Sequence, residues 1–301
     1  MLDIKKYAAI DIGSNAIRLL ISTVTDVEGR PPVFKKTSLV RVPIRLGSDV
    51  FVNNAISERN IQRMIDSMKA YQLLMDTHQV KAYKACATSA MREADNGLAV
   101  AERIKEETGI SIEIIDGDSE AAIIAATDLN DLIDSKKSYL YVDVGGGSTE
   151  FTIYSHGETI TSRSFKLGTV RLLNDLVSPE TWIELEQWIK ANTKSLEGID
   201  LIGSGGNINN IFKSSGKAMG KPLSYFYLSS YYQLLTSLTY EERIVQLNLN
   251  QDRADVIVPA AKIYLSAMKW SKARKIYVPK IGLSDGIIKT LYNQDKAALS
   301  T

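Results

Sequence analysis

The sequence is poor in the side chains that carry disulfide, thiolate or imidazole chemistry. Among 301 residues it has one cysteine, Cys86, and two histidines, His78 and His156. A lone cysteine has no partner for an internal disulfide or a thiolate metal site, and the apolar neighbours of Cys86 favour a buried structural thiol. The two histidines lie outside every motif described below, which excludes a histidine-rich metal site and disfavours a histidine–aspartate hydrolase centre.

Long apolar runs and an excess of one charge are also lacking. The 36 basic and 35 acidic side chains give a net charge of +1, so the total charge gives no reason to expect nucleic acid or an anionic membrane as a partner. No stretch approaches membrane-spanning length, and the apolar run before Asp11 is too short for a signal peptide. We therefore expect a cytoplasmic protein that binds neither nucleic acid nor membrane.

What is present is an ordinary globular composition, with 45% hydrophobic and 24% charged residues. Methionines and other apolar residues recur at helical spacing in residues 57–78, which predicts a long helix with a core-facing side. Strands are predicted at residues 84–87, 111–115 and 138–142, and helices at residues 119–132 and between Asn96 and Gly109. Alternating strands and helices favour an α/β protein.

An internal echo suggests that the chain is duplicated. Residues 7–14 and 139–146 share an apolar strand, an aspartate and a glycine in the same register, and further strand follows each, at residues 18–23 and 151–154. The repeat predicts two related lobes, residues 1–122 and residues 123–301, with the last helix able to pack back on the first lobe. No linker of distinctive composition marks this boundary.

Three glycine turns follow predicted strands. They are Asp11–Asn15, Asp143–Glu150 and Gly203–Gly206. Glycine lets the backbone approach phosphate oxygens closely, and successive N–H groups can converge on an anion. One such turn alone is typical of ordinary turn chemistry, but three at strand ends, two of them in duplicated registers, predict phosphate binding.

Carboxylates accompany these turns. Asp143 and Glu150 flank the triple glycine, and hard oxygen ligands suit Mg²⁺, which takes one or two carboxylates and completes its shell with water and phosphate oxygens. Glu120 stands at the predicted start of a helix, where by itself it is typical of capping. A Walker loop is absent, and a Rossmann dinucleotide site is disfavoured because the first two turns lead from strand to strand.

Three blocks resemble the exopolyphosphatase and guanosine pentaphosphate phosphatase family. They are residues 11–19, 87–94 and 143–150, and weaker echoes at residues 45–47, 117–121, 166–172, 203–206 and 282–286 extend the match over nearly the whole chain. The resemblance implies two ribonuclease-H-like lobes of the actin, sugar kinase and heat-shock chaperone ATPase superfamily, with an interlobe active-site cleft.

The resemblance also implies site roles. Glu120 would be the base that aligns a water and Arg92 would face the phosphates, while Asp143 and Glu150 would hold Mg²⁺ or a similar divalent cation. Phosphate binding is expected from the following residues: Asp11, Gly13, Ser14, Asn15, Arg18, Thr88, Ser89, Gly145, Gly146, Gly147, Ser148, Thr149, Gly205 and Gly206. This assembly suits phosphoryl transfer, which depends on in-line positioning and charge neutralisation.

The sequence departs from the family pattern in places. Asn207 and Ala260 stand where threonine and glycine are expected, and Asp118-Ser119 replaces a more acidic pair, changes that bear on substrate preference or rate. Longer relatives continue into a helical domain that helps to hold extended polyphosphate, whereas this sequence stops at Thr301. We therefore expect short substrates, or weak processivity on long ones.

The sequence thus predicts release of the terminal phosphate of inorganic polyphosphate, of guanosine pentaphosphate, or of both, with water as the acceptor. The departures at Asn207 and Ala260 keep open a sensor that binds the same ligands without hydrolysing them. A kinase on the same fold is a third alternative, although nothing marks an acceptor pocket. The apolar helices are compatible with a homodimer.

Overall fold

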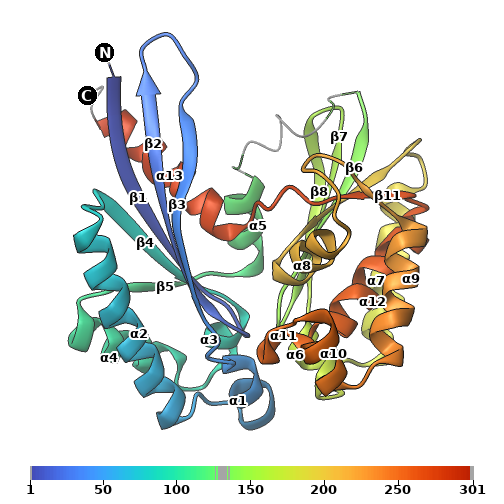
Figure 1. Cartoon of the computed structure of the whole chain (residues 1–301), viewed down its shortest axis with the longest axis horizontal. Helices are drawn as coiled ribbons and strands as arrows, with labels where there is room; N and C mark the ends of the chain where they lie inside the picture. Colours follow the sequence, from blue (N-terminus) through green and yellow to red (C-terminus); the bar gives the residue numbers. More distant parts are fainter. Residues whose placement is uncertain (1, 126, 128–133, 135, 299–301) are drawn as a thin grey trace. The chain divides into compact units, whose positions relative to one another are not determined.

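The computed structural model describes residues 2–125, 127, 134 and 136–298 (Figure 1). The chain forms two compact units, Met1–Thr127 with Leu283–Thr301, and Asp128–Gly282. The division expected at residues 122/123 falls inside helix α5 (Gly117–Ala125), five residues before the observed one. The last helix, α13 (Leu283–Ala298), belongs to the first unit.

The first unit is built on a five-stranded sheet with the order β3-β2-β1-β4-β5. Its strands are β1 (Leu2–Ile12), β2 (Ile17–Val27), β3 (Val33–Val42), β4 (Ala82–Ala87) and β5 (Ile112–Ile114). The first three strands are antiparallel neighbours, while β4 runs parallel to β1 and β5 runs parallel to β4.

The second unit repeats this plan in a six-stranded sheet with the order β10-β11-β9-β6-β7-β8. Its strands are β6 (Ser138–Val144), β7 (Thr149–Ser155), β8 (Glu158–Phe165), β9 (Asp200–Ser204), β10 (Leu223–Ser224) and β11 (Lys275–Tyr277). Again three strands form an antiparallel meander, and β9 and β11 follow in parallel. With β10 as an addition, the two sheets match strand for strand, which confirms the duplication predicted from the sequence.

Helices of the first unit pack around its sheet. They are α1 (Leu46–Asn53), α2 (Glu58–Thr77), α3 (Ser89–Glu93), α4 (Gly97–Thr108), α5 and α13. The predicted long helix is α2: Ser57 caps it through the N–H of Asn60, and its methionines are buried against the core. Cys86, on β4, is fully buried as expected. Burial raises the pKa of the Cys86 thiol to about 12, which keeps it protonated and unreactive.

Two other predicted helices differ in detail from the expectation. Asn96 does precede α4, and Gly109 ends it in the left-handed region with φ 73°. The Asn96 side chain, however, bonds the N–H and the carbonyl of Ile56 instead of capping its own helix. Helix α5 begins at Gly117, before the expected start at Ser119, and most of the expected end of this helix, residues 126 and 128–132, lies outside the described residues.

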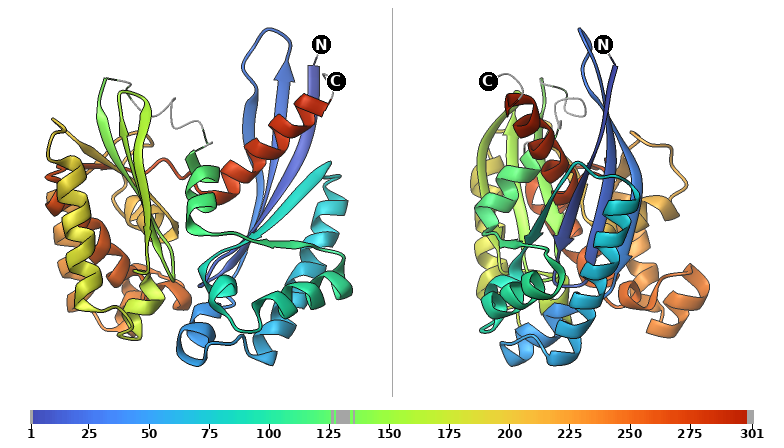
Figure 2. Two further views of the ribbon diagram at one scale, coloured as in Figure 1. Left: turned by 180° about the vertical axis from the view of Figure 1, so that it is seen from behind. Right: turned by 90° about the vertical axis from the view of Figure 1, so that its left-hand side faces the viewer.

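The second unit packs its helices around a single apolar core. They are α6 (Thr169–Leu173), α7 (Pro179–Thr193), α8 (Gly206–Ser214), α9 (Tyr225–Ser237), α10 (Tyr240–Leu247), α11 (Gln251–Ala254) and α12 (Ile257–Ser271). Helix α12 contacts α7, α8 and α9 (Figure 2). Its apolar residues join those of β6, β7 and β9 in the core. Burial of these apolar side chains is the main force that holds the glycine turns in place.

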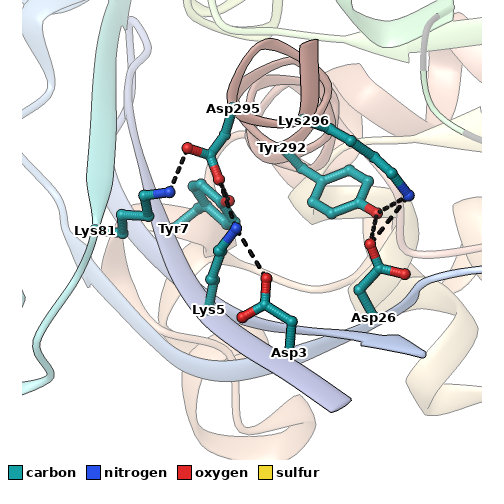
Figure 3. A network of polar contacts seen from close by, with 8 residues as sticks. All are labelled: Asp3, Lys5, Tyr7, Asp26, Lys81, Tyr292, Asp295 and Lys296. Atoms are coloured by element: carbon teal, nitrogen blue, oxygen red, sulfur yellow. Dashed lines mark hydrogen bonds and ion pairs between the residues drawn. The ribbon is translucent and has the colours of Figure 1, made fainter. Parts of the chain in front are cut away.

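Helix α13 joins the end of the chain to its beginning. It lies along β1, β2 and β4, and its Asp295 accepts hydrogen bonds from Lys5, Lys81 and the hydroxyl of Tyr7 (Figure 3). Tyr292 and Lys296 both donate to Asp26 at the end of β2. Within the part of the chain that the structure describes, no helix is long and apolar enough to cross a membrane.

Candidate active site

The first glycine turn joins β1 to β2 in the first unit. Asp11 and Arg18 are register partners across this hairpin, and the Arg18 Nη1 atom lies 3.3 Å from Asp11 Oδ2. Asp11 is only 8% exposed. Burial raises the pKa of Asp11 above its ordinary value, and the positive charge of Arg18 opposes that rise. Because a carboxylate repels phosphate oxygens, Asp11 would act on a phosphate ligand by orienting Arg18.

Backbone hydrogen bonds fix the shape of this turn. The Gly13 N–H donates to the Ala16 carbonyl at 3.1 Å, and the carbonyl of Ser14 accepts the Gly47 N–H at 2.7 Å. The Asn15 carbonyl accepts the Arg45 N–H at 2.9 Å, with Arg45 itself in the left-handed region at φ 64°. Residues 45–47, one of the weaker matches to the family, therefore hold the first turn through backbone hydrogen bonds.

The second specific block of the sequence lies beside the first turn. Ser89, the first residue of α3, has its Oγ 2.9 Å from the Ser14 Oγ, and both side chains are buried. The Thr88 N–H donates to the Ile12 carbonyl at 3.1 Å, next to the parallel pairing of β4 with β1. The structure thus brings Ser14, Thr88 and Ser89 together at one end of this sheet.

Arg92 and Glu120 belong to adjoining elements of the same unit. Arg92, on α3, donates from Nη1 to the Ile115 carbonyl at 2.6 Å, just before the loop that leads into α5. Glu120 lies in the first turn of α5, and its N–H donates to the Asp116 carbonyl at 3.0 Å. The side chain of Asp116 accepts the Ser119 N–H at 2.7 Å. A capping hydrogen bond at this turn therefore comes from Asp116, whereas the sequence alone favours Glu120 as the capping residue.

The second glycine turn joins β6 to β7 in the second unit. Asp143 and Glu150 are register partners across this hairpin, as Asp11 and Arg18 are in the first. Directly paired residues of antiparallel strands project from the same face of a sheet. Glu150 is 2% exposed, and its Oε1 accepts from Ser148 Oγ at 2.7 Å and from Ser164 Oγ at 2.9 Å.

The carbonyl groups of this turn face helix α6. Those of Gly145 and Gly146 accept the N–H groups of Thr169 and Val170 at 3.0 and 2.8 Å, and the Gly147 carbonyl accepts Arg171 Nε at 2.8 Å. Over the described residues, the N–H groups of Gly146 and Gly147 have no protein acceptor. These two N–H groups are therefore available to an anion.

The third glycine turn joins β9 to α8 and meets the second turn. Gly205 has φ 108°, and a Cβ there would lie 3.0 Å from the Val144 carbonyl oxygen and 3.3 Å from Asp143 Oδ1. Ser204 Oγ lies 3.2 Å from Asp143 Oδ2. Only glycine suits this position, because it allows both the positive φ and the close approach to Asp143.

Two arginines of the second unit, Arg253 and Arg171, were assigned no site role from the sequence. Arg253 lies over the start of α8, where a Cβ on Gly206 would be 2.7 Å from its Nη1, and it donates to Asn207 Oδ1 at 3.4 Å. No motif signals Arg253. Arg171 lies inside the block at residues 166–172 that carried the resemblance, so the sequence marked its position without indicating its contact with Gly147.

A divalent cation fits the donor set beside the second turn. Asp143 and Glu150 provide two carboxylates on one face of the sheet, and the N–H groups of the turn are suited to phosphate oxygens that would complete the shell of Mg²⁺. In the described residues, no group of three or more histidine, cysteine or acidic side chains is arranged to hold a metal by itself. Such a site would depend on water and a phosphate ligand, as Mg²⁺ sites commonly do.

Two ribonuclease-H-like units, each with an aspartate and a glycine turn between its first two strands, define the duplicated fold of the actin-like ATPases. The chain belongs to the Ppx/GppA phosphatase family, whose model matches residues 21–294. This membership confirms the resemblance inferred from the sequence blocks.

Curated relatives cover part of the chain. A bifunctional 3-dehydroquinate synthase/phosphatase of Fusobacterium nucleatum is 34% identical over 206 residues, which are 63% of this chain and 30% of that protein. Exopolyphosphatase 2 of Mycobacterium tuberculosis is 30% identical over 56% of this chain and 53% of its own length. A guanosine-5'-triphosphate,3'-diphosphate pyrophosphatase of Photobacterium profundum is 29% identical over 64% of this chain and 35% of its own. The matches thus span between 30% and 53% of these relatives.

Solved structures match nearly the whole chain. An exopolyphosphatase from Cytophaga hutchinsonii has a TM-score of 0.82 at 24% identity and covers 96% of this chain and 98% of its own. A Ppx/GppA family member from Aquifex aeolicus has a TM-score of 0.76 at 24% identity and covers 97% and 99%. These likenesses confirm the fold.

Proposed function

We propose that this protein is a phosphohydrolase that releases the terminal phosphate of inorganic polyphosphate, of guanosine pentaphosphate, or of both. The observation that carries the proposal is the pair of equivalent hairpins, one with Asp11 and Arg18 and the other with Asp143 and Glu150. Membership of a phosphatase family supports it. So do relatives named exopolyphosphatase and guanosine-5'-triphosphate,3'-diphosphate pyrophosphatase. Each hairpin turn would bind phosphate oxygens of a phosphoanhydride substrate.

In the second unit, Asp143 and Glu150 would hold Mg²⁺. The ion would neutralise charge on the phosphate oxygens and orient the transferred group. The turn at residues 145–148 would bind the neighbouring phosphate through the N–H groups of Gly146 and Gly147, with Thr149, Gly205 and Gly206 completing the cradle. Ser148 and Ser164 would fix the Glu150 carboxylate by the hydrogen bonds that they donate to it.

In the first unit, Glu120 would act as the base. Its carboxylate would accept a proton from water as the water oxygen forms a bond to the terminal phosphorus and the bridging P–O bond breaks. Arg92, held by the Ile115 carbonyl, would contribute positive charge to the transferred group. The residues of the first turn, Gly13 to Asn15, together with Arg18, Thr88 and Ser89, would bind phosphate oxygens.

The substitution Glu120→Gln tests the proposed base. We expect phosphate release to fall at least about 100-fold, since a general base contributes roughly 10² to 10⁴ in rate, while substrate affinity stays within a few fold. Glu106→Gln, at an exposed position on α4, is the control and should leave both unchanged. Full phosphate release by Glu120→Gln would rule out this residue as the base.

A second candidate function is a sensor that binds these ligands without hydrolysing them. It is motivated by Asn207, which lies in the first turn of α8 and accepts a hydrogen bond from Arg253. The other departure, Ala260, is buried in the core on α12. Saturable binding of guanosine pentaphosphate or polyphosphate, with no phosphate release in the presence of Mg²⁺, would favour the sensor.

The preference between the two substrates, the cytoplasmic location and a homodimer stay predictions. Nucleic acid and membranes are not proposed as partners. A comparison of turnover on guanosine pentaphosphate, short polyphosphate and long polyphosphate would settle the substrate preference.

A further inference from the structure

Ser204 lies between the proposed metal carboxylate and the segment that leads to the last helix. It is the last residue of β9, 1% exposed, and it is the register partner of Asp143 on the parallel strand β6. The segment Val278–Gly282, which we call the connector, follows β11 and precedes α13 in the chain. In sequence, the connector is the passage from the second unit back to the first.

The Ser204 hydroxyl has one proton and two nearby acceptors. Its Oγ lies 2.6 Å from the Ile281 carbonyl oxygen in the connector and 3.2 Å from Asp143 Oδ2. A hydroxyl donates one hydrogen bond, and O–H···O distances usually fall between about 2.5 and 3.0 Å. The shorter distance favours Ile281, and the charged carboxylate of Asp143 competes for the same proton.

The backbone of Ser204 cannot easily move to satisfy both acceptors. The buried hydroxyl of Tyr264, on α12, donates to the Ser204 carbonyl. The next residue, Gly205, is fixed at φ 108° against the Val144 carbonyl and Asp143. The Ser204 hydroxyl can still rotate. It can therefore donate to either acceptor while the backbone stays in place.

We propose that Ser204 is a positioning residue that couples divalent-cation binding at Asp143 to the order of the connector. The inference rests on the proposed role of Asp143 as a Mg²⁺ ligand. A bare carboxylate is the stronger acceptor, because hydrogen bonds to charged groups are roughly twice as strong as neutral ones. A bound cation draws charge from the carboxylate and weakens it as a competing acceptor, so the Ser204 hydroxyl donates to Ile281 for a larger share of the time and the connector is held more firmly.

The test is hydrogen exchange of connector amides with and without Mg²⁺, combined with the Mg²⁺ dissociation constant from calorimetry. In the unaltered protein, Mg²⁺ should slow exchange at Ile281 and Gly282 several fold. In Ser204→Ala the slowing should disappear and Mg²⁺ affinity should fall about 10-fold, the lower end of the 10–100-fold loss seen when an outer-shell partner of a metal ligand is removed. Ser204→Thr, which keeps a hydroxyl, should restore the Mg²⁺-dependent slowing.

Ser271→Ala is the matched control, because Ser271 is also a buried serine but bonds only helix carbonyls on α12. It should leave the response to Mg²⁺ unchanged. Normal Mg²⁺ binding and an unchanged exchange response in Ser204→Ala would overturn the coupling and leave the metal site standing. Absence of Mg²⁺ binding in the unaltered protein, with Asp143→Asn as the reference, would overturn the metal site and the coupling together.

Discussion

The carboxylate of Asp11 is buried at the end of β1 with the guanidinium of Arg18 beside it. Burial raises the pKa of Asp11 from its ordinary 3.8, so the ionised form costs stability in the fold. That cost is absent at low pH and appears as the pH rises past the ordinary pKa. A charge kept at such a cost beside a glycine turn is typical of a functional residue.

Asp11→Asn should therefore stabilise the protein while it weakens substrate binding. At pH 7 we expect unfolding to require about 1 kcal/mol more free energy, a usual size for one substitution, because burial disfavours the ionised form of Asp11 and the partly exposed Arg18 keeps its contact with water. The gain should vanish near about pH 3. Urea denaturation at both pH values measures it, with Asp66→Asn on the exposed side of α2 as control. A lower free energy of unfolding for Asp11→Asn than for the unaltered protein at pH 7 would mean that the ion pair with Arg18 stabilises the fold by more than burial of the carboxylate costs.

Gly168 shows how a single side chain would disturb the second turn. A Cβ there would lie 2.2 Å from the Gly146 carbonyl oxygen. Gly168→Ala should therefore displace the triple-glycine turn, lower stability by about 3 kcal/mol as strong overpacking does, and abolish binding of phosphate ligands. Gly198→Ala is the control: that residue has φ 64° and open space around it, so it should cost only about 1 kcal/mol. Thermal denaturation and calorimetric titration measure both effects.

At the scale of elements, helix α13 is secured by charge as well as by apolar packing. Asp295 accepts from Lys5 at 3.0 Å and from the Tyr7 hydroxyl at 2.8 Å, and Lys81 donates to its other oxygen (Figure 3). These hydrogen bonds, that of Lys81 foremost, hold the pKa of Asp295 well below its ordinary 3.8. The ionised carboxylate is thus the form that ties α13 to β1.

Asp295→Asn should lower the free energy of unfolding at pH 7 by about 2 kcal/mol, as loss of hydrogen bonds to a charged group does. Because the folded pKa is lowered, this stabilisation is complete above the ordinary pKa and is lost as the pH falls through the folded value. The difference between variant and unaltered protein should therefore shrink at about pH 2.5. Glu186→Gln, which removes an exposed pair with Lys190, should cost at most about 0.5 kcal/mol. An equal difference at both pH values would contradict the role of the ionised carboxylate.

Elements with a clear periodicity could be predicted from the sequence. The apolar spacing of α2 and the strand, aspartate, glycine pattern of β1 and β6 each identified an element correctly. No local pattern indicates that Asn96 bonds Ile56, because a side chain that can cap its own helix can equally bond a distant backbone group. The predicted start of α5, at residue 119, is two residues later than the observed start at Gly117, because the side chain of Asp116 caps the helix through the Ser119 N–H.

At the scale of the whole molecule, the duplicated sheet is what the sequence predicted best. The two hairpins share a register, so a repeated motif in the sequence became a repeated structure. Contacts that join distant segments could not be predicted: Arg253 reaches the start of α8 from α11, and Ser204 reaches Ile281. Such contacts depend on tertiary packing and leave no local pattern.

In the proposed reaction, water attacks the terminal phosphorus of a phosphoanhydride bound to this protein. Phosphate release from guanosine pentaphosphate and from polyphosphate, measured in ¹⁸O-labelled water with Mg²⁺, tests it most directly. We predict orthophosphate that carries one ¹⁸O atom per molecule, and guanosine tetraphosphate or a polyphosphate shortened by one unit as the other product. Absence of orthophosphate from both substrates, or orthophosphate without the label, would contradict the claim.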